Sequence, residues 1–145
     1  FASWDLIDRM PELPDHWPVI EEATETMPYR LVTAPARSYL NSSFTETPTS
    51  IAREGKPTVM IHPDDAADLG VGNDDVVQLG NDRGELPIAV EIFDGVQRGV
   101  VVVESIWPNA AFAGGKGINV LTGADPVAPV GGAAFHDNRI WIRRM

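Results

Sequence analysis

Hydrogen-bond donors are concentrated in one stretch of this chain, between residues 33 and 43. Hydroxyl groups, an amide and a guanidinium within one loop could together bind phosphates or a purine. The donors are Thr33, Arg37, Tyr39, Asn41, Ser42 and Ser43. An ordinary solvent-facing loop has a similar composition, and the spacing of these residues does not separate the two interpretations.

The sequence contains no comparable motif for a hydrolytic active site. The histidines, His16, His62 and His136, stand in unrelated sequence contexts, and none lies beside a nucleophile-elbow motif. His62 directly precedes Pro63, a position where a capping or packing role is expected. The sequence therefore predicts no catalytic residue in this chain.

Metal and phosphate motifs are equally weak. Asp64 and Asp65 fall in the first turn of an expected helix, where carboxylates face its positive end, and Asp68 is expected on a solvated face. The chain has no cysteine, which removes thiolate ligands and cysteine nucleophiles. Residues 114–117 (GGKG) lack the spacing and the following Ser or Thr of a phosphate-binding loop. No metal site is predicted.

The elements that must position the donors are best defined around a short helix. Pro63 suits a first helical position, and Gly70 suits the residue that ends a helix. Ala66, Ala67 and Leu69 are expected to form its inward face. A helix of about two turns is too short to persist in water alone, so it must pack on a sheet.

Short strands surround this helix. A turn at 81–84, with Gly84 expected at positive φ, predicts a hairpin. Residues 39–49 and the Gly-rich segments 114–117 and 130–134 are expected to be loops. The expected strands are 29–33, 59–61, 76–79, 88–92, 100–103 and 139–143. Many short strands with one or two short helices predict a mainly β fold that closes into a barrel.

Charge and composition divide the chain into an arm and a domain. The net charge is −10, which disfavours nucleic-acid binding, and no apolar run is long enough for a membrane span. Seven of the 21 acidic residues fall in the first 28 residues, which also contain four prolines. We expect 1–28 to be an extended connector and 29–145 one domain. The connector is either a flexible linker or, as Trp4 and Trp17 favour, a segment that packs on another surface.

Four motifs, in order, resemble one known family. They are LVTAPARSYLNSSF (31–44), IHPDDAADLGVGNDDVVQL (61–79) followed by Arg83 and Gly84, RGVVVVESIW (98–107) and INVLT (118–122). Together they resemble the C-terminal molybdopterin dinucleotide-binding domain of the dimethyl sulfoxide reductase, formate dehydrogenase and nitrate reductase superfamily. The resemblance covers about residues 29–145. It implies a six-stranded double-psi β-barrel with short helices that binds molybdopterin guanine dinucleotide.

The resemblance also assigns residues. The loop that matches the family's nucleotide and pyrophosphate segment runs from Thr33 to Ser42. Asn119 matches an asparagine that contacts a pterin, Trp107 falls near the substrate funnel, and His136 stands where relatives often have lysine. The implied cofactor-binding residues are Thr33, Ala34, Pro35, Arg37, Ser38, Tyr39, Leu40, Asn41, Ser42, Trp107, Asn119 and His136.

Family enzymes carry the molybdenum or tungsten ligand and any iron–sulfur cluster in preceding domains of the same polypeptide. The resemblance therefore implies that this chain binds and orients part of the cofactor while the redox reaction occurs elsewhere. A non-enzymatic double-psi barrel that binds protein partners is the alternative. The substrate, the choice between molybdenum and tungsten, and the cellular compartment stay open.

Overall fold

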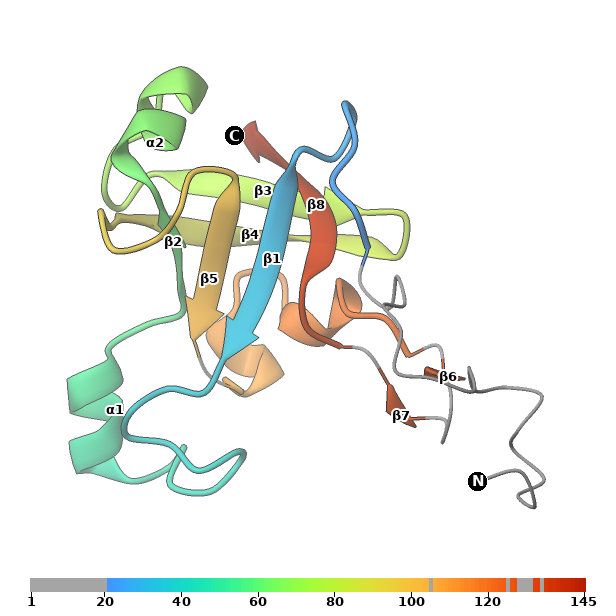
Figure 1. Ribbon diagram of the computed structural model, residues 1–145. Helices are drawn as coiled ribbons and strands as arrows, with labels where there is room; N and C mark the ends of the chain where they lie inside the picture. The colour runs from blue at the N-terminus through green and yellow to red at the C-terminus, as the bar shows by residue number, and fades with distance from the viewer. Residues whose placement is uncertain (1–20, 105, 125, 128–131, 134) are drawn as a thin grey trace, which may run out of the picture.

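The computed structural model describes residues 21–104, 106–124, 126–127, 132–133 and 135–145. Six strands close into a barrel in the order β1-β5-β2-β4-β3-β8 (Figure 1). The barrel strands are β1 (Tyr29–Ala34), β2 (Thr58–Ile61), β3 (Val76–Asn81), β4 (Gly84–Ile92), β5 (Val100–Glu104) and β8 (Asn138–Arg144). The prediction of a mainly β, six-stranded barrel is confirmed.

The barrel combines parallel and antiparallel pairs. β1 is parallel to β5, and β2 is parallel to β4, while the remaining neighbours are antiparallel. The other elements are α1 (Pro48–Glu54), α2 (Pro63–Leu69), η2 (Asn109–Ala111), η3 (Ile118–Val120), β6 (Pro126–Val127) and β7 (Gly132–Ala133). Within the part of the chain that the structure describes, no helix is long and apolar enough to cross a membrane.

The barrel interior is filled by alternate residues of every strand. Side chains of a strand point to opposite faces in turn, so one set enters the core and the other faces outward. Valine, isoleucine and leucine dominate the inner set, as expected for strands whose inner face forms a hydrophobic core. The fully buried members include Leu31, Val59, Ile61, Val77, Leu79, Leu86, Val90, Val101, Val103 and Ile140.

Helix α2 begins and ends as predicted. His62 is its N-cap, and its Nδ1 accepts a hydrogen bond from the Asp64 amide at 3.1 Å. Gly70 follows the helix with a left-handed φ of 67°. The predicted inward face is only partly correct, because Ala66 is buried whereas Ala67 is exposed.

Asp65 is a buried acceptor as well as a helix-start charge. Its side chain accepts the Gly99 amide at 2.7 Å and the Arg98 Nε at 3.1 Å. These bonds attach α2 to the turn that precedes β5. The sequence did not reveal this function, because the partners lie more than 30 residues away.

Three local predictions need correction. Residues 39–49 are not all loop, because α1 begins at Pro48. Gly84 does not adopt a positive φ. Instead, η3 lies close to it: a Cβ at this position would be 3.2 Å from the Val120 carbonyl oxygen, which is tighter than an ordinary contact. Gly132–Ala133 forms β7, paired with β6. Residues 1–20 of the predicted connector and residues 130, 131 and 134 of the predicted loop lie outside the described residues.

Candidate functional site

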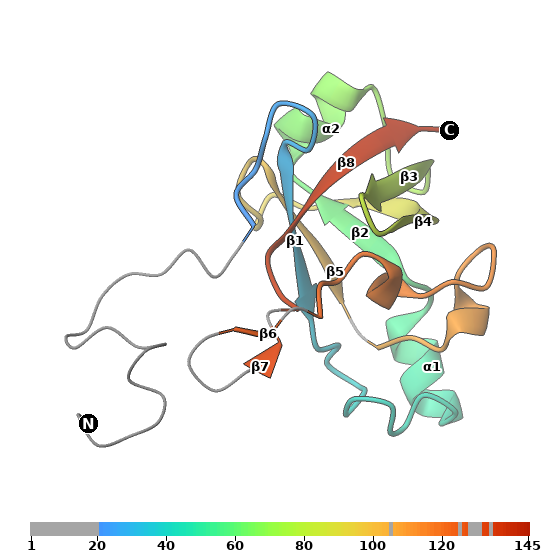
Figure 2. The ribbon, with the colours of Figure 1, turned by 90° about the vertical axis from the view of Figure 1, so that its right-hand side faces the viewer.

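A cavity of about 340 Å³ lies at one end of the barrel. β1 and β5 run parallel, so both end here, and β8 begins here; Figure 2 shows the three meeting next to the η3 region. The lining residues are Thr33, Ala34, Pro35, Ala36, Tyr39, Asn41, Ile106, Ile118, Asn119, Thr122, Phe135 and His136. The cavity thus combines apolar walls with hydroxyl, amide and imidazole groups, and none of these lining residues is Asp, Glu, Lys or Arg.

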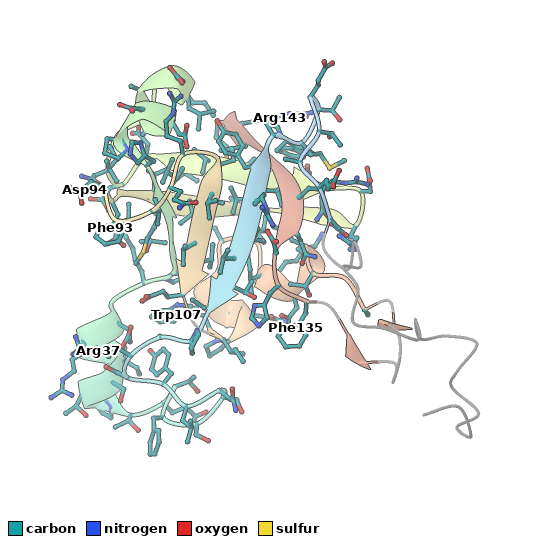
Figure 3. The ribbon with its side chains drawn as sticks, viewed as in Figure 1. Arg37, Phe93, Asp94, Trp107, Phe135 and Arg143 are labelled. Atoms are coloured by element: carbon teal, nitrogen blue, oxygen red, sulfur yellow. The ribbon has the colours of Figure 1, made fainter. Side chains whose placement is uncertain are left out.

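The cavity brings together residues that are distant in sequence. Those among the expected cofactor contacts are Thr33, Ala34, Pro35, Tyr39, Asn41, Asn119 and His136. Other expected contacts do not line it, namely Arg37, Ser38, Leu40, Ser42 and Trp107. Figure 3 shows Arg37 beside α1, on the far side of the β1 terminus from Phe135. The role of each residue in binding stays a prediction.

Thr33 and His136 both line the cavity, and their side chains are in direct contact. Thr33 Oγ1 lies 3.1 Å from His136 Nδ1, and the Phe135 and His136 rings have centroids 4.4 Å apart. The neighbouring Asp137 is fixed by Arg30, whose Nε donates to Asp137 Oδ1 at 2.6 Å. This hydrogen bond raises the pKa of Arg30 and strengthens the ion pair. The start of β8, and with it His136, is therefore anchored to β1.

Tyr39 lines the cavity, and its hydroxyl is buried without a partner among the described residues. The residue is 6% exposed, and its Oη has no hydrogen-bond partner. Its ring packs edge-on against Trp107 with centroids 5.1 Å apart. Trp107 is in turn held by its Nε1, which donates to the Glu104 carbonyl at 3.1 Å. Burial, followed by the charge of Glu54, raises the pKa of Tyr39, so the hydroxyl remains a donor at neutral pH.

An unpaired buried hydroxyl typically costs about 1–3 kcal/mol, which a ligand with a suitably placed acceptor would recover. Such groups are rare in folded proteins, where most buried polar atoms have partners. Tyr39 is therefore a polar group of the cavity wall whose hydrogen bond the described residues do not supply.

The loop after β1 folds back on itself and on α1. Leu40 and Ser43 exchange backbone hydrogen bonds, and Asn41 between them has a left-handed φ of 52°. The Ser38 amide donates to Glu54 Oε1 at 2.6 Å, which ties the loop to the end of α1. This tight turn directs Asn41 to the cavity while Leu40 is 65% exposed.

Several lining residues escaped the sequence interpretation. They are Ala36, Ile106, Ile118, Thr122 and Phe135. Thr122 carried a usable signal, because residues three apart lie on one side of a 3₁₀ turn and it follows Asn119 by three. Its Oγ1 donates to the Asn119 carbonyl at 3.2 Å. The described residues hold no cluster of three or more His, Asp or Glu suited to a metal ion.

The strand order and the two parallel pairs define a double-psi β-barrel with a cavity at one end. Residues 29–139 match the family described as "Molydopterin dinucleotide binding domain". The chain belongs to this family, whose members form the C-terminal domain of molybdopterin oxidoreductases. Its cofactor is molybdopterin guanine dinucleotide, and the adaptor alternative is not favoured.

Named relatives agree with this assignment. "Probable oxidoreductase YoaE" of Bacillus subtilis is 30% identical over 141 residues, which cover 95% of this chain and 20% of that protein. "Dimethyl sulfoxide reductase DmsA" of Escherichia coli is 28% identical over 154 residues, covering 99% of this chain and 19% of that protein. This chain therefore spans about a fifth of the length of these relatives.

A solved structure shares the fold. Acetylene hydratase from Pelobacter acetylenicus matches with a TM-score of 0.67 and 15% identity, covering 82% of this chain and 18% of that one. At this identity the likeness concerns the architecture alone.

Proposed function

We propose that this chain is the cofactor-binding lobe of a larger molybdenum or tungsten oxidoreductase, and that its cavity holds part of the molybdopterin guanine dinucleotide. When bound, the cofactor supplies the redox chemistry at its metal. The residues of this chain bind and orient it. Partners in this proposal are the preceding domains of the same polypeptide, reached through a connector formed by residues 1–28, with residues 29–145 as the barrel domain.

The cavity with its uncharged polar lining is the observation that carries this proposal. Beside the cavity, the Tyr39 hydroxyl is buried and protonated without a partner among the described residues, and its ring already packs edge-on against Trp107. Thr33, Asn41 and Asn119 add hydroxyl and amide groups around the same cavity. Uncharged donors beside apolar walls suit a heterocyclic ring with polar edges, such as guanine or a pterin.

The length of the relatives supports the proposal that this chain is one domain of a larger protein. YoaE and DmsA are each about five times as long as the segment that matches this chain. The substrate would be selected mainly by the other domains.

The test compares Tyr39→Phe with Tyr29→Phe in the full-length protein. Tyr29 is a matched control, because it is the other tyrosine of the chain and does not line the cavity. Loss of one hydrogen bond worth about 1 kcal/mol is expected to speed cofactor release about fivefold in Tyr39→Phe. Release is measured by pterin fluorescence and guanine nucleotide content after gel filtration.

Two outcomes would contradict the proposal. The first is a purified full-length protein that contains neither molybdenum, tungsten nor a pterin. The second is equal release rates in Tyr39→Phe, Tyr29→Phe and the wild type, which would remove Tyr39 from the binding site. Asn119→Ala provides a second variant, for which faster release is also expected.

A further inference from the structure

Glu21, the first described residue of the connector, contacts the barrel close to the cavity wall. Its Oε2 accepts the backbone amide of Arg139 at 3.1 Å, just beyond the last paired residues of β3 and β8. Its carboxylate also forms an ion pair with the guanidinium of Arg83 in the β3–β4 hairpin. In Figure 1 this segment runs beside β8 and the hairpin. Glu21 therefore joins the connector to two barrel elements.

Arg83 extends the contact to η3. Its Nη1 lies 3.4 Å from Glu21 Oε2 and also donates to the carbonyl oxygen of Leu121 at 3.3 Å. Asn81 Nδ2 donates to the same carbonyl at 2.8 Å. Asn81 Oδ1 in turn accepts the Arg83 amide at 2.9 Å, which fixes the hairpin turn. The residue that follows η3 is thus held from the hairpin.

The hairpin and η3 are in close contact. A Cβ at Gly84 would lie 3.2 Å from the Val120 carbonyl oxygen and 3.4 Å from its Cβ. η3 itself is one short turn, with i to i+3 backbone hydrogen bonds of 3.0 to 3.3 Å. Such a turn has little stability of its own, so its place depends on these neighbours and on the burial of Ile118 and Leu121 in the core. Ile118, Asn119 and Thr122 on this turn line the cavity.

We propose that Glu21 is a positioning residue for the cofactor cavity. By holding Arg83 against the Leu121 carbonyl, Glu21 sets the η3 wall from which Asn119 and Thr122 reach the ligand. Attachment of the connector and the shape of the cavity are therefore coupled. The identity of the ligand rests on the proposed function, whereas the placement of the η3 wall does not.

Backbone amide exchange in the full-length protein tests the coupling. Glu21→Gln removes the charge but keeps the shape of the side chain. We expect the amides of Val120, Leu121 and Thr122 to exchange about five times faster than in the wild type, with β2 and β5 unchanged. Asp74→Asn is the matched control, because it removes the same charge from an exposed ion pair with Lys56 that does not line the cavity.

Two further measurements separate positioning from simple structural support. Arg83→Gln should have an effect at least as large, because Arg83 itself contacts the Leu121 carbonyl. The double variant should not exceed Arg83→Gln, because Glu21 acts on η3 through Arg83. Cofactor release should also accelerate about threefold in Glu21→Gln, but not in Asp74→Asn.

Each outcome is informative. Unchanged exchange at η3, additive effects of the two variants, or faster exchange with unchanged cofactor release would each overturn the inference. If the full-length protein holds no cofactor, the proposed function fails. Faster, non-additive exchange at η3 would then still establish that Glu21 sets the wall.

Discussion

Two side chains, Asp65 and Tyr39, show two outcomes of burying a polar group, which costs free energy unless the group is hydrogen-bonded. Asp65 is 5% exposed and is paired inside the protein with Arg98 and the Gly99 amide. Tyr39 is almost equally buried, yet its hydroxyl has no partner within the described residues. The first arrangement stabilises the fold, and the second leaves a buried donor unsatisfied, as the Oδ1 of Asn138 is an unsatisfied acceptor in the described part of the chain.

Asp65→Ala should lower the free energy of unfolding by about 2–3 kcal/mol, because the Gly99 amide would lose its acceptor in a buried place. Urea unfolding at neutral pH measures the change. Asp68→Ala is the control, since Asp68 contacts the same Arg98 but its side chain is 68% exposed. Exposed pairs contribute about 1 kcal/mol or less. Similar losses in both variants would contradict the assignment of Asp65 as a structural acceptor.

Glu104 should make the protein less stable as the pH rises. Burial, followed by the charges of Glu54 and Glu91, raises the pKa of Glu104 above its usual value of 4.5. The folded state then holds the proton more tightly than the unfolded state, so stability falls as the pH rises from the unfolded pKa through the folded one. Glu104→Gln should therefore be more stable than the wild type at pH 7, by about 0.5 kcal/mol.

The difference between Glu104→Gln and the wild type should shrink below pH 4.5, where the carboxyl is protonated in both states. Urea unfolding at several pH values measures it. Exposed Glu85 supplies a control, Glu85→Gln, for general charge effects. A stability gain that persists unchanged in acid would contradict the role of Glu104 ionisation.

At the scale of elements, the sequence predicted what is determined locally. α2 was recognisable because a histidine cap, a proline at its first position and a C-terminal glycine all lie within nine residues. α1 was missed because Thr47 makes no side-chain cap and the helix buries none of its residues, so no apolar period marks it. Gly84 was predicted to serve a turn with positive φ. Its side-chain space is instead limited by η3, where Val120 lies 36 residues further along the chain.

Gly80 gives a prediction for the β3–β8 pair. A Cβ there would lie 2.0 Å from Cζ2 of Trp141, the residue paired with it across the two strands. Trp141 also lies under Arg143, whose guanidinium carbon is 4.1 Å from the ring centroid. Gly80→Ala must therefore displace a tryptophan that also packs against Arg143, and we expect a loss of about 2–3 kcal/mol.

Thermal or urea unfolding measures the loss caused by Gly80→Ala. Gly72→Ala serves as the control, because its Cβ would meet its nearest neighbour, Asp75 Oδ2, at an ordinary 3.8 Å. In the Trp141→Ala background, Gly80→Ala should cost much less, since the clashing ring is gone. Equal costs in both backgrounds would show that another contact opposes the added methyl group.

At the scale of the whole molecule, the two ends of the barrel differ in how they are held together. The α2 end is closed by caps and by the Asp65 hydrogen bonds. The cavity end is assembled from the loop after β1, Ile106, the η3 segment and residues 135–136. The sequence identified many of the donors through the family motifs. It could not show which of them line one cavity. That depends on β1 and β5 ending, and β8 beginning, at the same end of the barrel.

Removal of the cofactor should therefore affect the cavity end far more than the α2 end. The cavity walls come from loops and short turns, so the ligand would supply contacts between them that the barrel hydrogen bonds do not. Ligand binding stabilises the state that binds it, and a ligand present at 100 times its dissociation constant contributes about 2.7 kcal/mol. Backbone amide exchange of the full-length protein, with and without cofactor, should show faster exchange at residues 35–44 and 117–122 in the cofactor-free form. Residues 62–70 and β4 should exchange equally in both forms, and the cofactor-free protein should unfold at a lower temperature. Exchange that increases uniformly around the barrel would mean that the cofactor stabilises the whole domain and that the cavity end is not a separate unit.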